Sequence, residues 1–117
     1  MNVEEFREYC ISLKGVTEEF PFGGEVLVFK VMGKMFALTV LDKEFSINIK
    51  CNPDLAIELR EKYTAVVPGY HMNKTHWNTV IMDGTVSNKL ISEWINHSYQ
   101  IVVDKLPKIL KNKLNTL

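Results

Sequence analysis

Three short apolar runs follow one another closely in the first half of the chain, and they constrain the fold more than any other feature. The runs lie at 25–32, 35–41 and 45–51, and the links between them have only two or three residues. In the third run the apolar residues occupy every second position, which is typical of a strand with one buried and one exposed face. Links this short join antiparallel neighbours, because a parallel crossover needs about a dozen residues or more. We therefore predict an antiparallel meander.

Helices are predicted on both sides of these runs. The first extends from Val3 to Lys14, with an N-cap at Asn2 and Gly15 as the residue that ends it. Asn52 and Pro53 begin a second helix, since Asn is a favoured N-cap and Pro a favoured first residue. The third helix begins after a serine cap and ends or kinks at a proline; the two residues are Ser87 and Pro107.

A short strand at 16–20, an apolar run at 65–67 and a strand-like run at 77–82 complete the predicted sheet. The resulting order is helix, strands, helix, two strands, helix. It predicts an α+β fold with an antiparallel sheet of about five or six strands and helices packed on one face. We expect one domain over 1–117, in which 107–117 is an amphipathic tail that can fray.

Charge and composition limit the partners that the chain can have. No apolar run approaches the ~20 residues of a membrane helix, and the acidic N-terminus resembles no targeting signal, so we expect a cytoplasmic protein without membrane contact. The formal net charge is zero. Residues 1–25 carry six Glu against Arg7 and Lys14, a net of −4, so the remaining 92 residues sum to +4. Any basic surface for nucleic acid must therefore be local.

The stretch 63–84 holds polar and aromatic residues on a predicted loop between two strands, which favours a recognition surface. Its side chains, with two lysines beside the earlier strands, could stack on bases or contact phosphate. The alternative is that Trp77 and Tyr70 anchor the core and that His76 and Asn78 bond to turn backbone. The candidates for nucleic-acid binding are Lys34, Lys50, Tyr70, His71, Lys74, His76, Trp77 and Asn78.

The residues predict no metal site, no cofactor and no catalytic centre. His71 and His76 have no third ligand nearby, whereas zinc takes three or four. Cys10 and Cys51 are widely separated and are expected to be buried, inert thiols. No G-x-S-x-G elbow or phosphate-binding glycine loop is present. An enzyme or small-ligand binder would require a pocket lined by His71, His76 and Trp77.

Several motifs together resemble the MmcQ/YjbR family of small bacterial proteins, and the resemblance covers the chain from end to end. The most specific is VPGYHMNKTHWNTV at 67–80. Shorter matches are PFG at 21–23, FKV at 29–31, GKMFA at 33–37, NIK at 48–50 followed by Pro53, SY at 98–99 and LPK at 106–108.

The resemblance implies a CyaY-like or secretion-chaperone-like α+β fold. It also implies DNA binding through a double-wing arrangement of β-hairpins, and it brings no enzymatic activity or cofactor. Carried over by position, it points to the eight candidates named above. The alternative function is a protein- or peptide-binding module resembling a secretion chaperone, which would act as a homodimer.

Overall fold

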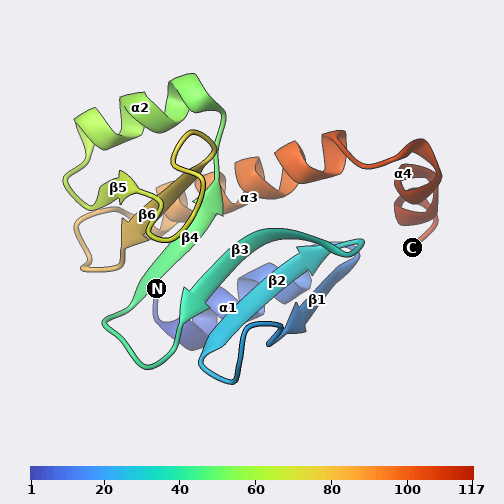
Figure 1. The fold of residues 1–117 in the computed structure, drawn as a ribbon, viewed down its shortest axis with the longest axis horizontal. Helices are drawn as coiled ribbons and strands as arrows, with labels where there is room; N and C mark the ends of the chain where they lie inside the picture. Colours follow the sequence, from blue (N-terminus) through green and yellow to red (C-terminus); the bar gives the residue numbers. More distant parts are fainter.

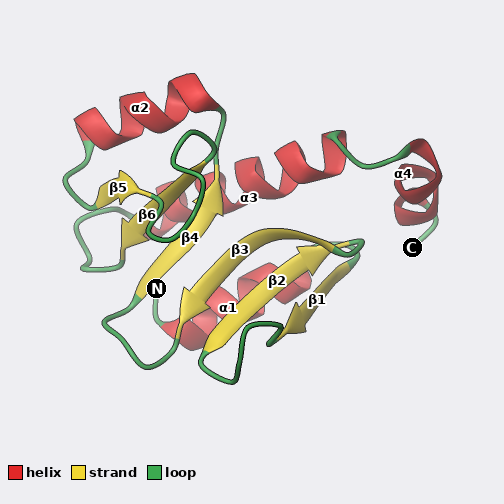
Figure 2. Cartoon of the chain, viewed as in Figure 1, coloured by secondary structure: helices red, strands yellow, loops and turns green.

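A computed structural model describes residues 1–117, and its centre is a six-stranded sheet in which every pair of neighbours is antiparallel. The strand order is β1-β2-β3-β4-β6-β5 (Figures 1 and 2). The bounds are β1 Val16–Glu19, β2 Val26–Val31, β3 Lys34–Val40, β4 Ser46–Lys50, β5 Val66–Pro68 and β6 Trp77–Ile81. The predicted α+β fold class and the meander of β2, β3 and β4 are confirmed.

Four helices accompany the sheet: α1 Val3–Ser12, α2 Pro53–Lys62, α3 Asn88–Asp104 and α4 Lys108–Asn115. The predicted caps are confirmed, because the side chains of Asn2, Asn52 and Ser87 each accept a hydrogen bond from the first turn of their helix. The end of α1 was predicted two residues too late. Leu13 already has extended backbone, and Gly15, at φ 74°, lies in the turn that leads into β1.

The turn between β2 and β3 lies one residue earlier than the predicted link at 33–34. Its two residues are Met32, at φ 49°, and Gly33, at φ 84°. Positive φ at both positions gives the backbone twist that matches two antiparallel strands, and glycine adopts it at low cost. Lys34 therefore begins β3 and stands at the tip of the hairpin.

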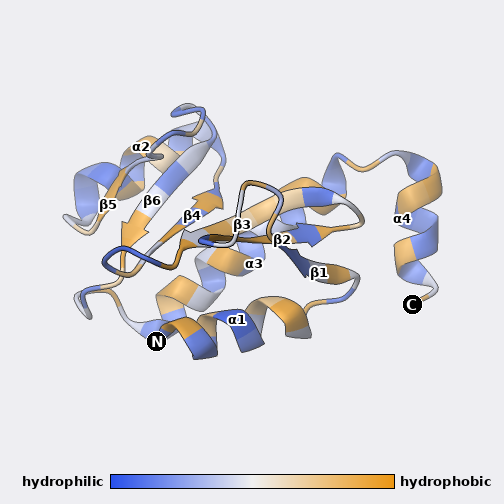
Figure 3. Ribbon diagram, turned by 60° about the horizontal axis from the view of Figure 1, so that its bottom comes forward, coloured by the Kyte–Doolittle hydropathy of each residue, from blue (hydrophilic) through white to orange (hydrophobic).

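The helices α1, α2 and α3 lie on one side of the sheet, as predicted, whereas α4 lies beyond its end. Figure 3 shows α1 and α3 in a layer beneath the strands, and α2 packs against β5 and β6. The largest fully buried side chains of the core between these layers include Phe6, Phe29, Phe36, Ile47 and Ile95. The opposite face of the sheet carries no helix, and no helix of the structure has the length and apolar character needed to span a bilayer.

The sheet is weakly joined at its middle. β3 and β4 pair at only two positions, Ala37 with Ile49 and Leu38 with Asn48, and beyond them the strands diverge (Figure 1). The hydroxyl of Ser98 on α3 lies at this divergence. It donates to the carbonyl of Phe36 at 2.6 Å and accepts from the amide of Lys50 at 2.8 Å. One buried side chain thus replaces a backbone hydrogen bond of the ladder.

The C-terminal segment, for which the sequence predicts only an amphipathic turn or two, forms α4. Leu114 of this helix is buried and lies against Gly15, where a Cβ would come within 2.5 Å of a Leu114 methyl carbon. Lys14 also donates to the carbonyl of Asn115 at 3.4 Å. The end of the chain is therefore packed beside the turn that follows α1, and its fraying stays a prediction.

Candidate functional site

A cleft of about 490 Å³ opens on the helix-free face of the sheet. It lies between the β1–β2 loop, which contributes Phe22, and the β5–β6 loop, which crosses the near side of the sheet in Figure 1. Its apolar lining residues are Phe22, Val26, Met35, Leu38, Val40 and Met72. Its polar and amphipathic lining residues are Lys43, Ser46, Asn48, Tyr70, His71 and Thr79. None of them is an acid.

The floor of the cleft is set by strand register. Leu38, Asn48 and Thr79 are direct cross-strand partners on β3, β4 and β6, so their side chains project from the same face. The hydroxyl of Thr79 accepts a hydrogen bond from the amide of Tyr70 at 3.0 Å and donates its own proton to Oδ1 of Asn48. The β5–β6 loop is thereby attached to the floor.

The Asn48 amide is oriented by its bond to Thr79. The Thr79 hydroxyl accepts from the amide of Tyr70 and gives its single proton to Oδ1 of Asn48, so the oxygen of the Asn48 amide faces Thr79. The Nδ2 group of Asn48 forms no hydrogen bond within the protein, and no fully buried side-chain nitrogen or oxygen lacks a partner. Nδ2 is therefore open to the cleft.

Arg60 of α2 holds the other end of the β5–β6 loop. Its guanidinium donates to Asn78 Oδ1 at 2.7 Å, to the Trp77 carbonyl at 3.3 Å and to the Lys74 carbonyl. The planar fork of arginine suits such a set of acceptors, since its donors point in fixed directions. Charged neighbours at 61 and 62 would place Arg60 on the solvated side of its helix, but the loop folds back over the side chain.

Gly69 allows the loop to turn tightly against β6. A Cβ built on it would lie 2.8 Å from Cβ of Trp77 and 2.9 Å from the Trp77 carbonyl oxygen. The amide of Gly69 donates to that same carbonyl at 2.9 Å, so the backbones are already in contact. The requirement for glycine here is steric. Beyond it, His71 stands at φ 58° at the exposed tip, with its ring 4.1 Å from that of Tyr70.

A second hollow, of about 380 Å³, lies where β3 and β4 diverge and collects positive charge. The hollow is lined by three lysines and a tryptophan, which are Lys34, Lys50, Lys105 and Trp77, and by no acidic residue. Nζ of Lys50 is 5.9 Å from the centre of the Trp77 ring. Partial burial, and secondarily the charge of Lys105, lower the pKa of Lys50. A like charge acting on Lys50 indicates that the lysines converge.

The eight predicted residues do not form one site. Lys34, Lys50 and Trp77 meet in the cationic hollow, and Tyr70 and His71 line the cleft. His76 lines a third, smaller hollow of about 200 Å³ with Asp104 and Lys105. The ammonium of Lys74 donates to the carbonyl of Gly69 at 3.1 Å, within its own loop.

Two of the predicted contacts require correction. Asn78 is 1% exposed, and its amide is occupied by Arg60 and by the carbonyl of Ala56, so it serves the core and is removed from the interface. Trp77 is 6% exposed, so it forms a wall and offers no free ring face for stacking. The pocket that would combine His71, His76 and Trp77 does not form, because these residues line three different hollows.

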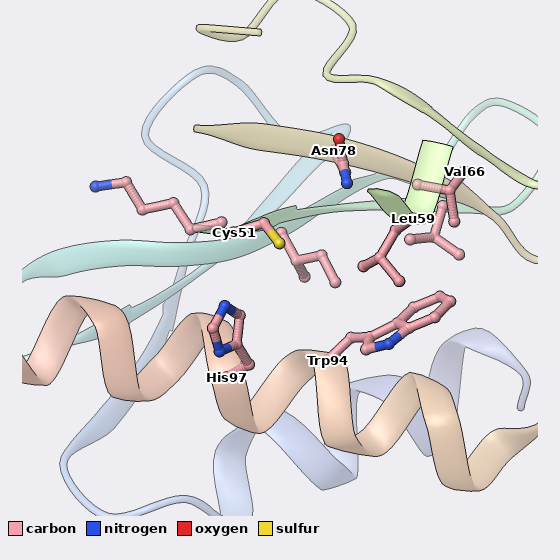
Figure 4. Close-up of a pocket in the computed structure, with 9 residues that line it drawn as sticks. Cys51, Leu59, Val66, Asn78, Trp94 and His97 are labelled. Atoms are coloured by element: carbon pink, nitrogen blue, oxygen red, sulfur yellow. The ribbon is translucent and has the colours of Figure 1, made fainter. Parts of the chain in front are cut away.

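Both cysteines are buried and unpaired, as predicted. Burial raises the pKa of the Cys51 thiol to about 11 and that of Cys10 further. Cys51 borders a void of about 10 Å³ beneath β4, together with Trp94 and His97 (Figure 4). A cavity needs roughly 10–15 Å³ to hold one water molecule. This void is therefore a small packing gap, too small to be a ligand site.

Sequence reasoning did not assign three groups to the site: the Arg60 clamp, the Asn48–Thr79 pair and Lys105. The sequence could have indicated Asn48 and Thr79 as functional candidates, since both are polar residues within strands. Their pairing depends on β4 and β6 being neighbours, with a helix and a strand between them in sequence. Nothing in the sequence indicated that Arg60 contacts the loop, because Glu and Lys neighbours on a helix are typical of a solvated face.

Comparisons with known proteins agree with this architecture. The family model described as YjbR matches residues 11–101. The uncharacterised protein YbdF of Escherichia coli O157:H7 is 38% identical over 90% of this chain and 87% of its own length. The uncharacterised YjbR of Escherichia coli K12 is 30% identical over 92% of each chain.

Solved structures extend the agreement to the fold. The crystal structure of the Deinococcus radiodurans protein DR2400 has a TM-score of 0.91 and 38% identity, and the match covers 97% of this chain and 88% of that one. A Pseudomonas syringae protein has a TM-score of 0.75 and 28% identity, and the match covers 86% of this chain and 98% of that one.

Proposed function

The chain belongs to the YjbR family, and we propose that it binds DNA through the hollow lined by Lys34, Lys50 and Lys105. The observation that carries the proposal is the convergence of these lysines in a chain of zero net charge. Most protein–DNA affinity comes from cations that neutralise phosphates and release counterions. A local group of three lysines without a lining acid supplies this contact despite the neutral total.

The arrangement favours contact with the phosphate backbone over base recognition. Lys34 stands at the tip of the β2–β3 hairpin, Lys50 ends β4 and Lys105 follows α3, so three elements present ammonium groups around one concave surface. The aromatic ring of Trp77 is covered, and the amide of Asn78 is already bonded. Binding through lysines alone has little dependence on base sequence, because phosphates carry no sequence information. The proposal involves no chemical step.

The test is the salt dependence of duplex DNA binding, measured by fluorescence anisotropy. Each neutralised phosphate contributes about −0.9 to the slope of log K against log salt, so three contacts give roughly −2.7. The affinity should then fall about 40-fold between 50 and 200 mM salt. The triple variant Lys34→Gln, Lys50→Gln, Lys105→Gln should lose most of the affinity and most of the slope.

A variant of equal net charge provides the control, with the three substitutions Lys62→Gln, Lys89→Gln and Lys113→Gln placed outside the hollow. It should keep a slope close to that of the parent. Equal losses in both triple variants would mean that only total charge matters, and the proposed site would then be wrong. A parent protein that shows no salt-dependent binding at low ionic strength would overturn the proposal itself.

A second candidate, a protein-binding module that acts as a homodimer, is supported by α4. Ile109 is 78% exposed and Leu117 is 62% exposed, although the buried Leu114 anchors the helix between them. A contiguous apolar surface formed by these side chains would suit a protein contact. Light scattering after size exclusion distinguishes the cases. A dimer that Ile109→Asp converts to a monomer supports this candidate, and a monomeric parent protein contradicts it.

A further inference from the structure

We propose that the cleft on the helix-free face binds a small amphipathic carboxylate, with its apolar body over the floor and its carboxylate at Asn48. This site is separate from the cationic hollow, and the inference does not depend on DNA binding. It rests on the size of the cleft, on the apolar walls and on the hydrogen-bond groups that the protein leaves free.

The size and lining suit a small molecule. The cleft volume of about 490 Å³ falls within the roughly 300–1,000 Å³ typical of small-molecule sites. Leu38 on the floor is 5% exposed, whereas Phe22 on the wall is 67% exposed and Tyr70 on the facing loop is 63% exposed. A ligand between the two loops would cover apolar and aromatic surface that now faces water, which favours binding by roughly 25 cal/mol per Å².

Two free groups of the cleft, Nδ2 of Asn48 and the ammonium of Lys43, can only donate, and no lining group is an anion, so the cleft favours an anionic head group. Nδ2 of Asn48 lies on the floor without a protein partner, and Oδ1 of the same amide accepts from the Thr79 hydroxyl. The ammonium of Lys43 forms no ion pair, since the only salt bridges are Arg7–Glu18 and Lys30–Glu19. A carboxylate accepts from both an amide and an ammonium, whereas a ligand ammonium would meet Lys43 and no acid.

The acidic residues next to lining residues in sequence are Glu25, Asp42 and Glu44, and none of them lines the cleft. The carboxyl groups of Glu25 and Asp42 lie against each other. A hydrogen bond with Asp42, and the charge of Asp42, raise the pKa of Glu25. These two carboxyls stand together where β2 begins and β3 ends, and the lining of the cleft itself contains no acid.

Octanoate, octan-1-ol and octylamine test the proposal because they share one apolar chain and differ only in the head group. Binding is followed by titration with two-dimensional amide NMR. Octanoate should bind with a Kd of about 0.1–1 mM and shift the Asn48 side-chain amide together with Leu38 and Thr79. Octan-1-ol should bind at least about tenfold more weakly, and octylamine should not bind detectably.

Asn48→Asp provides the sharpest variant. The new carboxylate can still accept from Thr79, but it replaces the free donor with an acceptor of negative charge. It should abolish octanoate binding and allow octylamine to bind, a gain that a misfolded protein cannot show. Phe22→Ala, at an exposed position, should weaken octanoate binding about three- to tenfold without unfolding the protein.

A lysine pair controls for charge. Lys43→Gln should weaken octanoate binding about three- to tenfold, whereas Lys89→Gln, on the exposed side of α3, should leave it unchanged. Equal binding of all three head groups would overturn the proposal, since the cleft would then be an unselective apolar surface. So would the absence of octanoate shifts at the cleft, or a folded Asn48→Asp variant that still prefers the carboxylate.

Discussion

Ser98→Ala should be among the most destabilising small substitutions in this protein, because one hydroxyl completes the sheet where β3 and β4 diverge. Continuing the register of Ala37 with Ile49 would put Phe36 opposite Lys50, and the Ser98 hydroxyl stands between their backbone groups. Ser98 is completely buried, so water cannot replace it without a structural change. Alanine would leave one amide and one carbonyl without partners.

The magnitude follows from these two groups. A buried donor or acceptor left unpaired costs about 1–3 kcal/mol, so two cost about 2–6 kcal/mol. The higher helix propensity of alanine returns about 0.5 kcal/mol. We expect a loss of about 3 kcal/mol in the free energy of unfolding. With an unfolding entropy of about 2.1 cal/mol/K per residue over 117 residues, this lowers Tm by about 12 °C.

Urea unfolding followed by circular dichroism measures the loss, and the m-value should stay unchanged. Ser92→Ala is the matched control, since Ser92 lies on the same helix and its hydroxyl bonds to no protein group. The control should change stability by less than about 0.5 kcal/mol. A Ser98→Ala loss of similar size to the control would refute the reasoning, because it would mean that the strands close and pair directly.

Three further predictions concern local features. Gly69→Ala should destabilise the protein by about 2 kcal/mol in urea unfolding, because its Cβ has no space beside Trp77; a neutral result would mean that the loop shifts freely. Because Arg7 lowers the pKa of Glu18, their ion pair stabilises the fold above about pH 4.5, and this contribution is lost as the pH falls. The difference in unfolding free energy between the parent and Arg7→Gln should therefore shrink below that pH. A difference that stays constant with pH would contradict this prediction. With a pKa of about 11, only on the order of 10⁻³ of Cys51 is thiolate at pH 8, so a thiol reagent should react with it fully only after unfolding; rapid reaction of the folded protein would contradict this.

The parts of the fold that the sequence predicted are those coded by neighbouring residues. Alternation in 45–51 identified β4 and its buried residues, and Ile47 and Ile49 indeed face the core. Caps are equally local, since Asn52 bonds to amides two and three residues along. Short links then determined that the early strands are antiparallel neighbours. Each of these inferences required only a few consecutive residues.

The site was harder to predict because its contacts join distant segments. Arg60 reaches acceptors 14–18 residues away, and nothing in α2 distinguishes it from the charged residues beside it. Lys105 lies in a lysine-rich C-terminal region, but its place beside Lys34 and Lys50 depends on where α3 crosses the sheet. Periodicity indicates that a residue is exposed, and only the fold determines which exposed residues meet.

The segment 67–80 that carries the family resemblance connects the two proposed sites and belongs wholly to neither. Its first part, at Tyr70 to Met72, lines the cleft, whereas Trp77 forms a wall of the cationic hollow. Met35 lines both. Substitutions of shared residues would therefore affect both sites, and Lys105→Gln and Asn48→Asp separate them because each changes the charge of one site alone.

The anchoring residue Arg60 explains the polar character of the segment 67–80 without any ligand, since its acceptors are the carbonyls of Lys74 and Trp77 and the side chain of Asn78. Much of the motif thus specifies the loop, and the exposed groups at its rim are those left for binding.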